Sequence, residues 1–476
     1  MKRASGVLMP IFSLPGEYSV GSFGSEAKKF VDFLAENGFT YWQILPYGVT
    51  DSFHSPYQSY SAFSGNPYFI DLPTLAKQGL ITKEELAEAK QKSPYLCEYK
   101  RLEKERMALL KKAAKRVSAT ERTRIADWAK ETYAGDFAKF MALKEANDGR
   151  CWVKWTNLTP DVDTEFAWQF TQYHFFAQLQ DLAEYAHKNG VRIIGDLPIY
   201  VSFDSCDVWS NPEQFMLDEK GYPTHVAGCP PDYFAKDGQL WGNPLYDWNK
   251  MKADGFSWWK KRLAFSLLGL DGLRLDHFRG FESFWAVPFG SKTAVNGEWL
   301  KGPGMDFVRA MKEVAGDKLI IAEDLGDITT EVEQLVIESE FPGMRVFQFA
   351  FLGGDNPHLP HNYIKNCVAY SGTHDNNTLL GYLWELDDDT RKTMLDYCGF
   401  QGNDWGIGWR DVLRVLMASP ADLVIFPIQD LLGYGADTRV NKPGIADENW
   451  QVRFTMSQIE SVDKEYFKKL NQLYYR

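Results

Sequence analysis

Gly272-Leu-Arg-Leu-Asp-His277 is a short apolar segment that ends on a carboxylate, and the pattern occurs twice more along the chain. The other two segments are Leu319-Ile-Ile-Ala-Glu-Asp-Leu-Gly326 and Val368-Ala-Tyr-Ser-Gly-Thr-His-Asp375. Each of the three predicts a buried strand that finishes in a polar tip. Because the active sites of parallel α/β proteins lie at the carboxyl ends of their strands, we expect Asp276, Glu323 and Asp375 to converge on one pocket.

Apolar runs rich in β-branched residues predict eight strands. They span Gly6–Ile11, Tyr41–Leu45, Val191–Ile199, Gly272–Asp276, Leu319–Glu323, Arg345–Phe351, Val368–Gly372 and Leu423–Pro427. Their near-continuous hydrophobicity indicates strands that are buried on both faces, as in a parallel sheet. Because helical patterns lie between several of them, the sequence predicts an α/β protein with a (β/α)8 barrel, the TIM-barrel fold. A doubly wound open sheet is the alternative.

Two of the predicted helices have distinct boundaries. A long, aromatic-rich helix is expected from Thr164 to His187. Another is expected after Asp327, which would be its N-cap, and Thr330 with Glu333 forms a capping-box pattern there.

The uneven spacing of the strands predicts one catalytic domain, 1–476, with three insertions on the catalytic face. We expect a helical insertion at about 76–160, a loop-rich insertion at 200–253 and a third insertion at 378–418. The short tail after Asp430 leaves no room for a C-terminal all-β domain.

The composition excludes several classes of partner. The formal net charge is -12, which disfavours nucleic acid and anionic membranes. No signal peptide or membrane-length apolar run is present, and the six cysteines form no C-x-x-C pair, so we expect reduced thiols in a cytoplasmic protein. Aromatic residues reach 15%; most of these rings are expected in the core, and some are expected to stack on sugars.

Each candidate acid has a structural alternative. Arg274 and Asp276 share one face of a strand, so Arg274 would keep Asp276 ionised as a nucleophile, or the two would form a structural ion pair. Glu323 arrives from an apolar run that would raise its pKa, as suits a proton donor, although it could instead cap the next helix. Asp375 is suited to bind sugar hydroxyls or to cap a helix beginning at Asn376. Asp196, in Ile193-Ile-Gly-Asp-Leu-Pro198, is a fourth strand-end acid.

Other chemistries have weak support. His358 and His361 lie three residues apart, but Pro360 argues against a helical metal site, so no metal is expected. Gly21-Ser-Phe-Gly24 lacks the lysine of a phosphate-binding loop, and the chain has no G-x-S-x-G motif of a serine hydrolase.

Several longer motifs resemble those of the 4-α-glucanotransferases, also called amylomaltases or disproportionating enzymes, of glycoside hydrolase family 77. They occur in the family's order and run through nearly the whole chain. The motifs are Tyr41-Trp-Gln-Ile-Leu-Pro46, Ser55-Pro-Tyr-Gln-Ser-Tyr-Ser-Ala-Phe-Ser-Gly-Asn-Pro-Tyr68, Gly195-Asp-Leu-Pro198, Pro230-Pro-Asp-Tyr-Phe-Ala-Lys-Asp-Gly-Gln-Leu-Trp-Gly-Asn-Pro244, Pro427-Ile-Gln-Asp-Leu-Leu-Gly433 and Arg439-Val-Asn-Lys-Pro-Gly444.

The resemblance implies a role for each candidate residue. Asp276 would be the nucleophile, Glu323 the general acid/base and Asp375 the stabiliser of the transition state. The implied substrate contacts are Tyr57, Asp196, Trp241, Arg274, His277, His374 and Asn441. The family acts on α-1,4-glucans with retention of anomeric configuration and needs no metal or organic cofactor.

The resemblance therefore implies an enzyme that transfers part of an α-1,4-glucan to the 4-hydroxyl of another glucan or of glucose. We hypothesise that 230–244 is a gate that keeps water from the intermediate. An α-amylase-like hydrolase is the nearest alternative, but such enzymes commonly carry a C-terminal all-β domain and often calcium. A non-catalytic glucan-binding protein is the alternative from another class.

Overall fold

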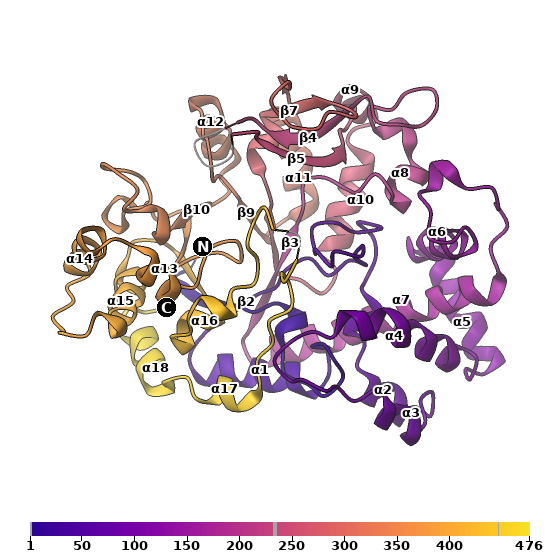
Figure 1. The fold of residues 1–476 in the computed structure, drawn as a ribbon, viewed down its shortest axis with the longest axis horizontal. Helices are drawn as coiled ribbons and strands as arrows, with labels where there is room; N and C mark the ends of the chain where they lie inside the picture. The colour runs from indigo at the N-terminus through magenta and orange to yellow at the C-terminus, as the bar shows by residue number, and fades with distance from the viewer. Residues whose placement is uncertain (1, 232–235, 446) are drawn as a thin grey trace.

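The computed structural model describes residues 2–231, 236–445 and 447–476, and its centre is a closed barrel of eight parallel strands (Figure 1). In barrel order the strands are β1 (Ala4–Leu8), β12 (Leu423–Pro427), β11 (Cys367–Tyr370), β10 (Gly343–Val346), β9 (Leu319–Ala322), β6 (Gly272–Leu275), β3 (Arg192–Leu197) and β2 (Tyr41–Gln43). The barrel prediction is confirmed, and the open-sheet alternative is wrong.

All eight predicted strands exist, and two of them end three or more residues before the expected end. The first was expected at Gly6–Ile11 and ends at Leu8, before Pro10. The sixth was expected at Arg345–Phe351, whereas β10 ends at Val346 and a 3-10 helix covers Phe347–Phe349. An apolar run does not separate a strand from the buried turn that follows it, because both have the same burial pattern.

Inward-facing side chains fill the barrel interior as a separate apolar cluster. Ile194 of β3, Ile321 of β9 and Tyr370 of β11 are among its members, all fully buried. Side chains of a strand alternate between its two faces, so Asp196 and Glu323, two residues beyond Ile194 and Ile321, continue the same inward face. The pleat of the barrel thus carries these two carboxylates to its carboxyl end.

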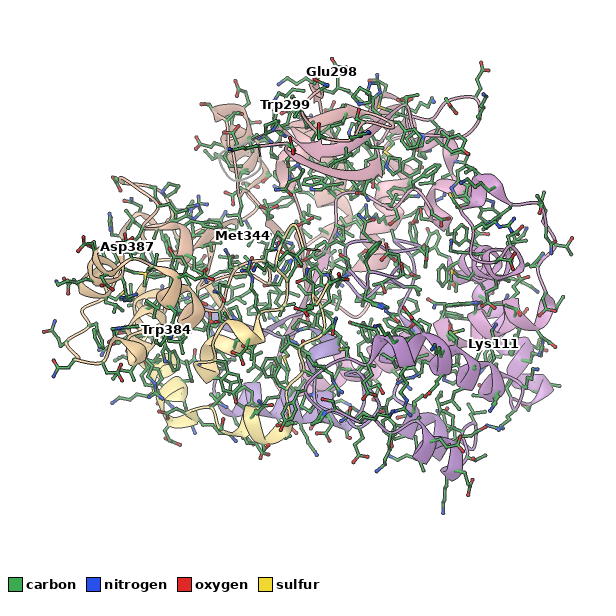
Figure 2. The ribbon with its side chains drawn as sticks, in the orientation of Figure 1. Lys111, Glu298, Trp299, Met344, Trp384 and Asp387 are labelled. Carbon is green, nitrogen blue, oxygen red and sulfur yellow. The ribbon has the colours of Figure 1, made fainter. Side chains whose placement is uncertain are left out.

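Helices surround the barrel (Figure 1), and their side chains fill the space between helices and strands (Figure 2). The helices of this layer include α1 (Ser25–Glu36), α7 (Val162–Lys188), α10 (Ser257–Ser266), α11 (Gly304–Ala315), α12 (Thr330–Ser339), α15 (Trp409–Ala418), α16 (Ile428–Leu432), α17 (Met456–Glu460) and α18 (Lys464–Leu473). The long aromatic helix is α7. Asp327 does not cap α12: the N-cap is Thr329, whose side chain makes no capping hydrogen bond.

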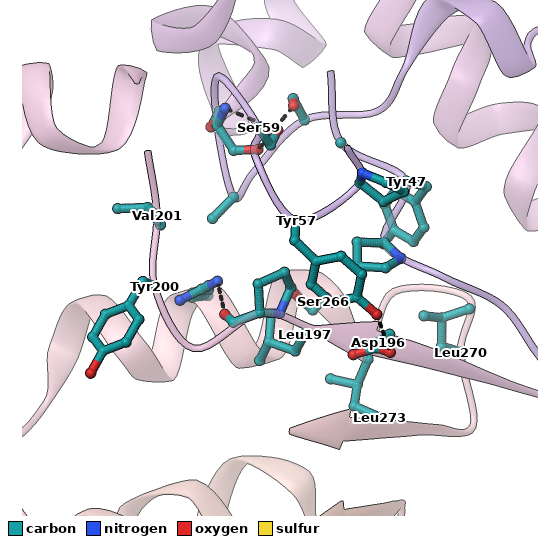
Figure 3. A pocket seen from close by; sticks show the side chains of 18 residues that line it. Tyr47, Tyr57, Ser59, Asp196, Leu197, Tyr200, Val201, Ser266, Leu270 and Leu273 are labelled. Atoms are coloured by element: carbon teal, nitrogen blue, oxygen red, sulfur yellow. Dashed lines mark hydrogen bonds between the residues drawn. The ribbon is translucent and has the colours of Figure 1, made fainter. Parts of the chain in front are cut away.

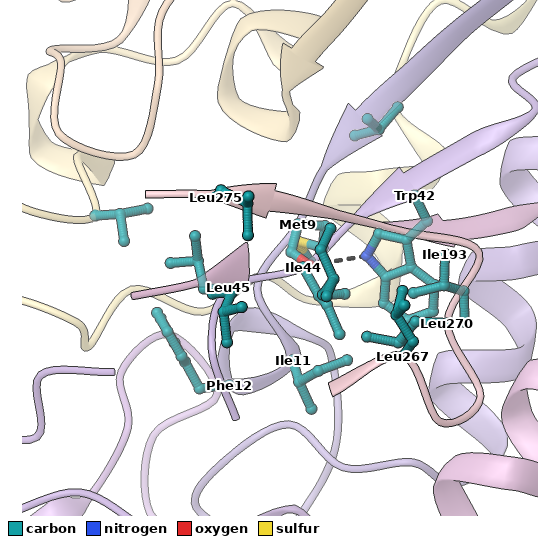
Figure 4. Packing of buried hydrophobic residues seen from close by; sticks show 14 of the residues in the cluster. Met9, Ile11, Phe12, Trp42, Ile44, Leu45, Ile193, Leu267, Leu270 and Leu275 are labelled. Atoms are coloured by element: carbon teal, nitrogen blue, oxygen red, sulfur yellow. Dashed lines mark hydrogen bonds between the residues drawn. The ribbon is translucent and has the colours of Figure 1, made fainter. Parts of the chain in front are cut away.

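The outer layer packs against the barrel through large apolar side chains. Figure 4 shows Trp42 of β2 among Met9, Ile193 and Leu270, with its indole Nε1 donating to the carbonyl of Met9 at 2.8 Å. Trp42 is fully buried, so this bond satisfies the polar atom that its burial would otherwise leave unpaired.

The segment between β2 and β3 is helical, as expected. It holds α2 (Leu72–Lys77), α3 (Lys83–Glu88), α4 (Tyr99–Ala114), α5 (Ala119–Glu131) and α6 (Ala134–Ala146). In the second insertion α8 (Cys206–Ser210) and α9 (Trp248–Ala253) flank two strands, and in the third α13 (Leu379–Glu385) and α14 (Asp388–Tyr397) precede α15.

A second sheet lies at the upper edge of Figure 1 and was not predicted. Its four antiparallel strands, in order, are β5 (Gln239–Pro244), β4 (His225–Cys229), β7 (Ser283–Pro288) and β8 (Glu298–Lys301). The 200–253 insertion, expected to be loop-rich, therefore supplies β4 and β5, and the residues after β6 supply the other two. Short, glycine-interrupted strands far apart in sequence leave no local periodicity from which to recognise such a sheet.

No helix in the described part of the chain is both long enough and apolar enough to cross a bilayer.

Candidate active site

The three predicted carboxylates lie at the carboxyl ends of the fourth, fifth and seventh barrel strands. Asp276 directly follows β6 and Glu323 directly follows the neighbouring strand β9, while Asp375 lies in the turn after β11. The backbone ladder continues past the strand ends, since Asp276 N donates to Leu197 O at 3.0 Å and Glu323 N to Leu275 O at 3.1 Å. The backbones of both acids are therefore fixed by the sheet itself.

All three carboxylates line one cavity of about 510 Å³. Five of the expected substrate contacts line it too: Tyr57, Trp241, Arg274, His277 and Asn441. Its volume is in the range of small-molecule sites, and its wall combines aromatic rings with a few charged groups.

Arg274 connects Asp196 with Asp276. The parallel register places Arg274 of β6 opposite Asp196 of β3, and Nη1 donates to both carboxylate oxygens at 2.9 and 2.8 Å. Nη2 lies 3.0 Å from Asp276 Oδ1. The structural ion pair therefore exists, and Asp276 also faces the cavity, so the two alternatives for this residue do not exclude each other.

Asp196 was expected to contact substrate, but its carboxylate is not available for that. Its side chain has 0% exposure, and besides Arg274 it accepts a hydrogen bond from the Tyr57 hydroxyl at 2.9 Å. Figure 3 shows Tyr57 pointing its hydroxyl at Asp196 beneath the loop. In this structure Asp196 positions Arg274 and Tyr57 instead of lining the cavity.

The side-chain pKa values of Asp276 and Glu323 differ. Burial raises the pKa of the Asp276 carboxyl to about 6, because it outweighs the opposing charge of Arg274. Arg274 was expected to keep this pKa low, and it only limits the rise. Burial also raises the pKa of the Glu323 carboxyl, to about 7, and here the charge of Asp276 adds to the effect. Near neutral pH, Asp276 is therefore the more ionised group and Glu323 the better proton donor.

Glu323 is held by two backbone amides. His277 N donates to Oε2 at 2.6 Å and Leu325 N donates to Oε1 at 2.9 Å. His277 has a left-handed backbone, with φ of 52°, which directs its amide at the carboxylate. The helix-cap alternative for Glu323 is wrong, since Thr329 is the N-cap of α12.

Asp375 is paired with His374 and Asn441. His374 Nε2 lies 3.3 Å from Oδ2, and Asn441 Nδ2 donates to Oδ1 at 2.6 Å. Burial raises the pKa of Asp375, but these two neighbours outweigh it and hold the pKa below its usual range. Burial likewise lowers the pKa of His374, and Asp375 outweighs it, so that pKa is raised. Asp375 is not a helix cap, because Thr378 caps α13.

Aromatic rings form two sides of the site. Tyr57 stacks on His374 with ring centroids 5.2 Å apart and an interplanar angle of 15°. Trp241 of β5 meets the His277 ring edge-on at 4.9 Å. Burial, with the charge of Arg279, lowers the pKa of His277 to about 3, so its imidazole is neutral at physiological pH.

Trp450 is a site residue that the sequence did not single out. It lines the cavity, is 6% exposed and lies 5.9 Å from the rings of both Tyr57 and His374. Its backbone is left-handed, with φ of 62°, and is held by bonds from its amide to Val440 O at 2.8 Å and from Tyr99 Oη to its carbonyl at 2.7 Å. No local pattern marks a lone tryptophan in an irregular loop.

Three further polar side chains belong to the site. Arg439 Nη2 donates to the carbonyl of Asp375 at 2.5 Å, and the motif Arg439-Val-Asn-Lys-Pro-Gly444 already contained this residue. Gln58 Nε2 donates to Asn243 Oδ1 at 3.3 Å, and both line the cavity. Gln58 follows Tyr57 in sequence, so its place beside Tyr57 is the signal that could have identified it.

The predicted gate, 230–244, is only partly described. Residues 232–235 lie outside the described residues, and 239–244 form β5, which brings Trp241 to the cavity. The role of the gate therefore stays a prediction.

His358 and His361 do not form a metal pair. His358 Nδ1 accepts from Val346 N at 3.1 Å, and His361 Nδ1 lies 2.9 Å from the Tyr397 hydroxyl. Among the described residues no cluster of three or more histidine, cysteine or acidic side chains is arranged to hold a metal ion.

The site holds two carboxylates of unequal pKa at adjacent strand ends of a parallel barrel, beside aromatic rings. This arrangement is typical of barrel enzymes that act on glycosidic bonds. The family model described as 4-alpha-glucanotransferase, of glycoside hydrolase family 77, matches residues 9–458, and the chain belongs to this family.

Relatives of known name match this chain over nearly its whole length. The 4-alpha-glucanotransferase of Synechocystis sp. is 42% identical over 509 residues, covering 100% of this chain and 98% of that protein. The 4-alpha-glucanotransferase of Clostridium butyricum is 43% identical over 471 residues, covering 94% and 95%. The solved amylomaltase from Streptococcus agalactiae in complex with acarbose has a TM-score of 0.95 and 38% identity, with 100% of both chains covered.

Proposed function

We propose that this protein is a 4-α-glucanotransferase. It transfers a segment of an α-1,4-glucan to the 4-hydroxyl of another glucan or of glucose, by a retaining double displacement. The observation that carries the proposal is the placement of Asp276 and Glu323 at adjacent strand ends of one cavity, with burial raising the pKa of Glu323 above that of Asp276.

In the first step Glu323 gives its proton to the glycosidic oxygen while Asp276 attacks the anomeric carbon. The bond to the leaving sugar breaks, that sugar departs with a free 4-hydroxyl, and a covalent glycosyl–Asp276 ester forms. Asp276 is suited to this role because Arg274 orients its carboxylate at 3.0 Å. A retaining mechanism requires the two carboxyl groups to lie about 5–5.5 Å apart.

In the second step Glu323 acts as the base. It takes the proton from the 4-hydroxyl of an acceptor glucan, whose oxygen attacks the anomeric carbon and displaces Asp276. The net result is exchange of one α-1,4 bond for another, and Glu323 regains its proton. Because the pKa of Glu323 is raised to about 7, both of its protonation states are populated near neutral pH, as the two steps require.

The remaining residues bind and orient. His374 and Asn441 keep Asp375 ionised. Its negative charge stabilises the positive charge that develops on the sugar in the oxocarbenium-like transition state. Tyr57 and Trp241 offer ring surfaces to the apolar faces of sugars. His277 is neutral, so it can donate or accept a hydrogen bond with a sugar hydroxyl.

We also propose that 1–476 works as a single catalytic domain in the cytoplasm. The thiols of Cys97, Cys206, Cys367 and Cys398 are free and buried, which suits a reducing compartment.

Incubation of the purified protein with maltotriose tests the function. Transfer produces glucose together with maltooligosaccharides longer than maltotriose. Glucose and maltose alone would identify a hydrolase, and unchanged maltotriose would identify a non-catalytic binding protein; either result would refute the proposal.

A further inference from the structure

The most exposed tryptophan lies outside the catalytic cavity. All 16 tryptophans fall in the described part of the chain, and only Trp299 and Trp384 are exposed, at 41% and 68%. The Arg279 guanidinium covers the Trp299 ring at 4.1 Å. Trp384 is on α13, in the insertion at the left of Figure 2, where a ring this exposed contributes little to folding.

A second tryptophan stands beside it. The rings of Trp384 and Trp405 meet edge to face, with centroids 4.7 Å apart and an interplanar angle of 70°. Ile407, 56% exposed and in the same 3-10 helix as Trp405, extends the apolar surface. We call the paired Trp384 and Trp405 rings, together with the neighbouring exposed Ile407, the Trp384 platform.

Arg391 connects the parts of the Trp384 platform. The Arg391 guanidinium lies 4.3 Å from the Trp405 ring centroid, and its Nη1 donates to Leu383 O at 3.1 Å and to Leu386 O at 2.9 Å. Arg391 therefore ties Trp405 to the end of α13 that carries Trp384. The only ring contact of Trp384 among the described residues is with Trp405, and the residue is 68% exposed, so a large part of its indole is accessible to a ligand.

The platform is attached to the catalytic loop. α13 begins at Leu379, shortly after Asp375 and Asn376, which both line the cavity. Asn377 Nδ2 donates to Glu385 Oε1 at 2.7 Å across the helix. A helix rises about 1.5 Å per residue, so Trp384 lies about 8 Å along α13 from its first residue. One short helix therefore connects the platform to the loop that carries Asp375.

Acidic residues beside the Trp384 platform favour an uncharged, hydroxyl-rich ligand over an anionic one. Asp387, Asp388 and Asp389 follow α13 and are exposed; Asp388 pairs with Arg391, and the carboxylates of Asp387 and Asp389 disfavour nucleic acid, phosphates and anionic lipids. Carboxylates accept hydrogen bonds from hydroxyl groups, and flat rings stack on the apolar face of a pyranose. Three side chains are too few for a stable protein interface, which buries about 800 Å² on each partner.

We propose that the Trp384 platform is a second binding site for α-1,4-glucan chains, which holds long substrates beside the catalytic cavity. The proposal rests on the proposed function, since it takes the polymeric substrate of this enzyme as the ligand. The exposed Trp384 ring offers a stacking surface to a sugar of the chain, and Trp405, which is covered by Arg391, supports that ring. The platform would favour long glucans over short ones, because only a chain longer than the cavity can occupy both sites at once.

Kinetics on two substrates test this inference. The variant is Trp384→Ala, and the matched control is Tyr475→Ala, which removes another exposed ring, 85% exposed, next to the chain end. One aromatic contact corresponds to about a two- to tenfold change in affinity. We expect Trp384→Ala to raise KM for amylose by this factor and to leave kcat and KM for maltotriose unchanged. The control should change neither.

Three results would overturn the inference: unchanged kinetics on amylose, equal losses on amylose and maltotriose, or the same loss in the control. Co-sedimentation with glycogen gives a direct measure, in which Trp384→Ala should bind several times less than wild type, and equal binding would contradict the site. These outcomes differ from a failure of the proposed function, in which the wild-type protein itself would form no longer oligosaccharides from maltotriose.

Discussion

The substitution Asp196→Asn tests whether Asp196 positions Arg274 and Tyr57 or contacts the substrate directly. The wild-type carboxylate receives two bonds from Arg274 and one from the Tyr57 hydroxyl, at 0% side-chain exposure. The asparagine keeps one oxygen to accept from Arg274, but its amide group is a donor and cannot accept the second bond. The variant therefore loses one charged hydrogen bond and leaves Arg274 with Asp276 as its remaining anionic partner.

The magnitude follows from this geometry. Breaking a buried ion pair costs about 3–5 kcal/mol, and the lower end applies because Arg274 keeps Asp276. For 476 residues the entropy of unfolding is about 1 kcal/mol per kelvin, so we expect Tm to fall by about 3 °C. Misplacing the stacking ring and the nucleophile should lower kcat about 100-fold. Because the charge of Asp196 raises the pKa of Asp276, the acidic limb of the pH profile should also move to lower pH.

Calorimetry and steady-state kinetics on maltotriose measure these effects. The matched control is Asp207→Asn, which alters a carboxyl that is also buried and accepts from Ala62 N at 2.8 Å, but has no ion pair among the described residues. The control should keep kcat and Tm close to wild type. If Asp196→Asn raised only KM and left Tm and kcat unchanged, the carboxylate would be a substrate contact and the positioning argument would be refuted.

Three further predictions concern the cavity. kcat/KM should be bell-shaped in pH, rising as Asp276 ionises near 6 and falling as Glu323 loses its proton near 7; a plateau up to pH 9 would contradict the assignment of Glu323 as the acid. Asn441→Ala removes a 2.6 Å hydrogen bond that lowers the pKa of Asp375, so the carboxyl pKa should rise and kcat should fall about 10-fold, and unchanged kinetics would count against it. Trp450→Ala should cost about 3–5 kcal/mol in the free energy of unfolding, measured by denaturant titration, and should raise KM; a neutral effect on both would show that the ring supports neither Tyr57 nor His374.

The barrel was predictable because each strand is a separate apolar run, and several of these runs end on a carboxylate. Asp276 and Glu323 could be assigned to one pocket since parallel strands end at the same side of the barrel. The pKa values of these two carboxyls could not be predicted. The pKa of Asp276 is raised by burial, and the spacing of Arg274 and Asp276 in the sequence does not reveal how deeply the carboxyl is buried.

The parts that escaped prediction depend on contacts between distant segments. β4 and β7 pair through His225–Gly228 and Trp285–Pro288, and neither segment has a distinctive pattern by itself. Asp196 is buried beside Arg274 and Tyr57, which come from other segments of the chain, and the place of Trp450 follows from bonds to Val440 and Tyr99. Sequence periodicity reports how a segment is buried, but not which segment covers it.

The central claim is that Asp276 forms a covalent bond with the transferred sugar. A glycosyl fluoride needs no acid for departure of fluoride, so Glu323→Gln should still form the intermediate and should lack the base that resolves it. Mass spectrometry of the digested variant after reaction with a maltosyl fluoride should find one glycosyl group on the peptide that contains Asp276. An unlabelled Asp276 peptide, or a label on another carboxylate, would contradict the mechanism.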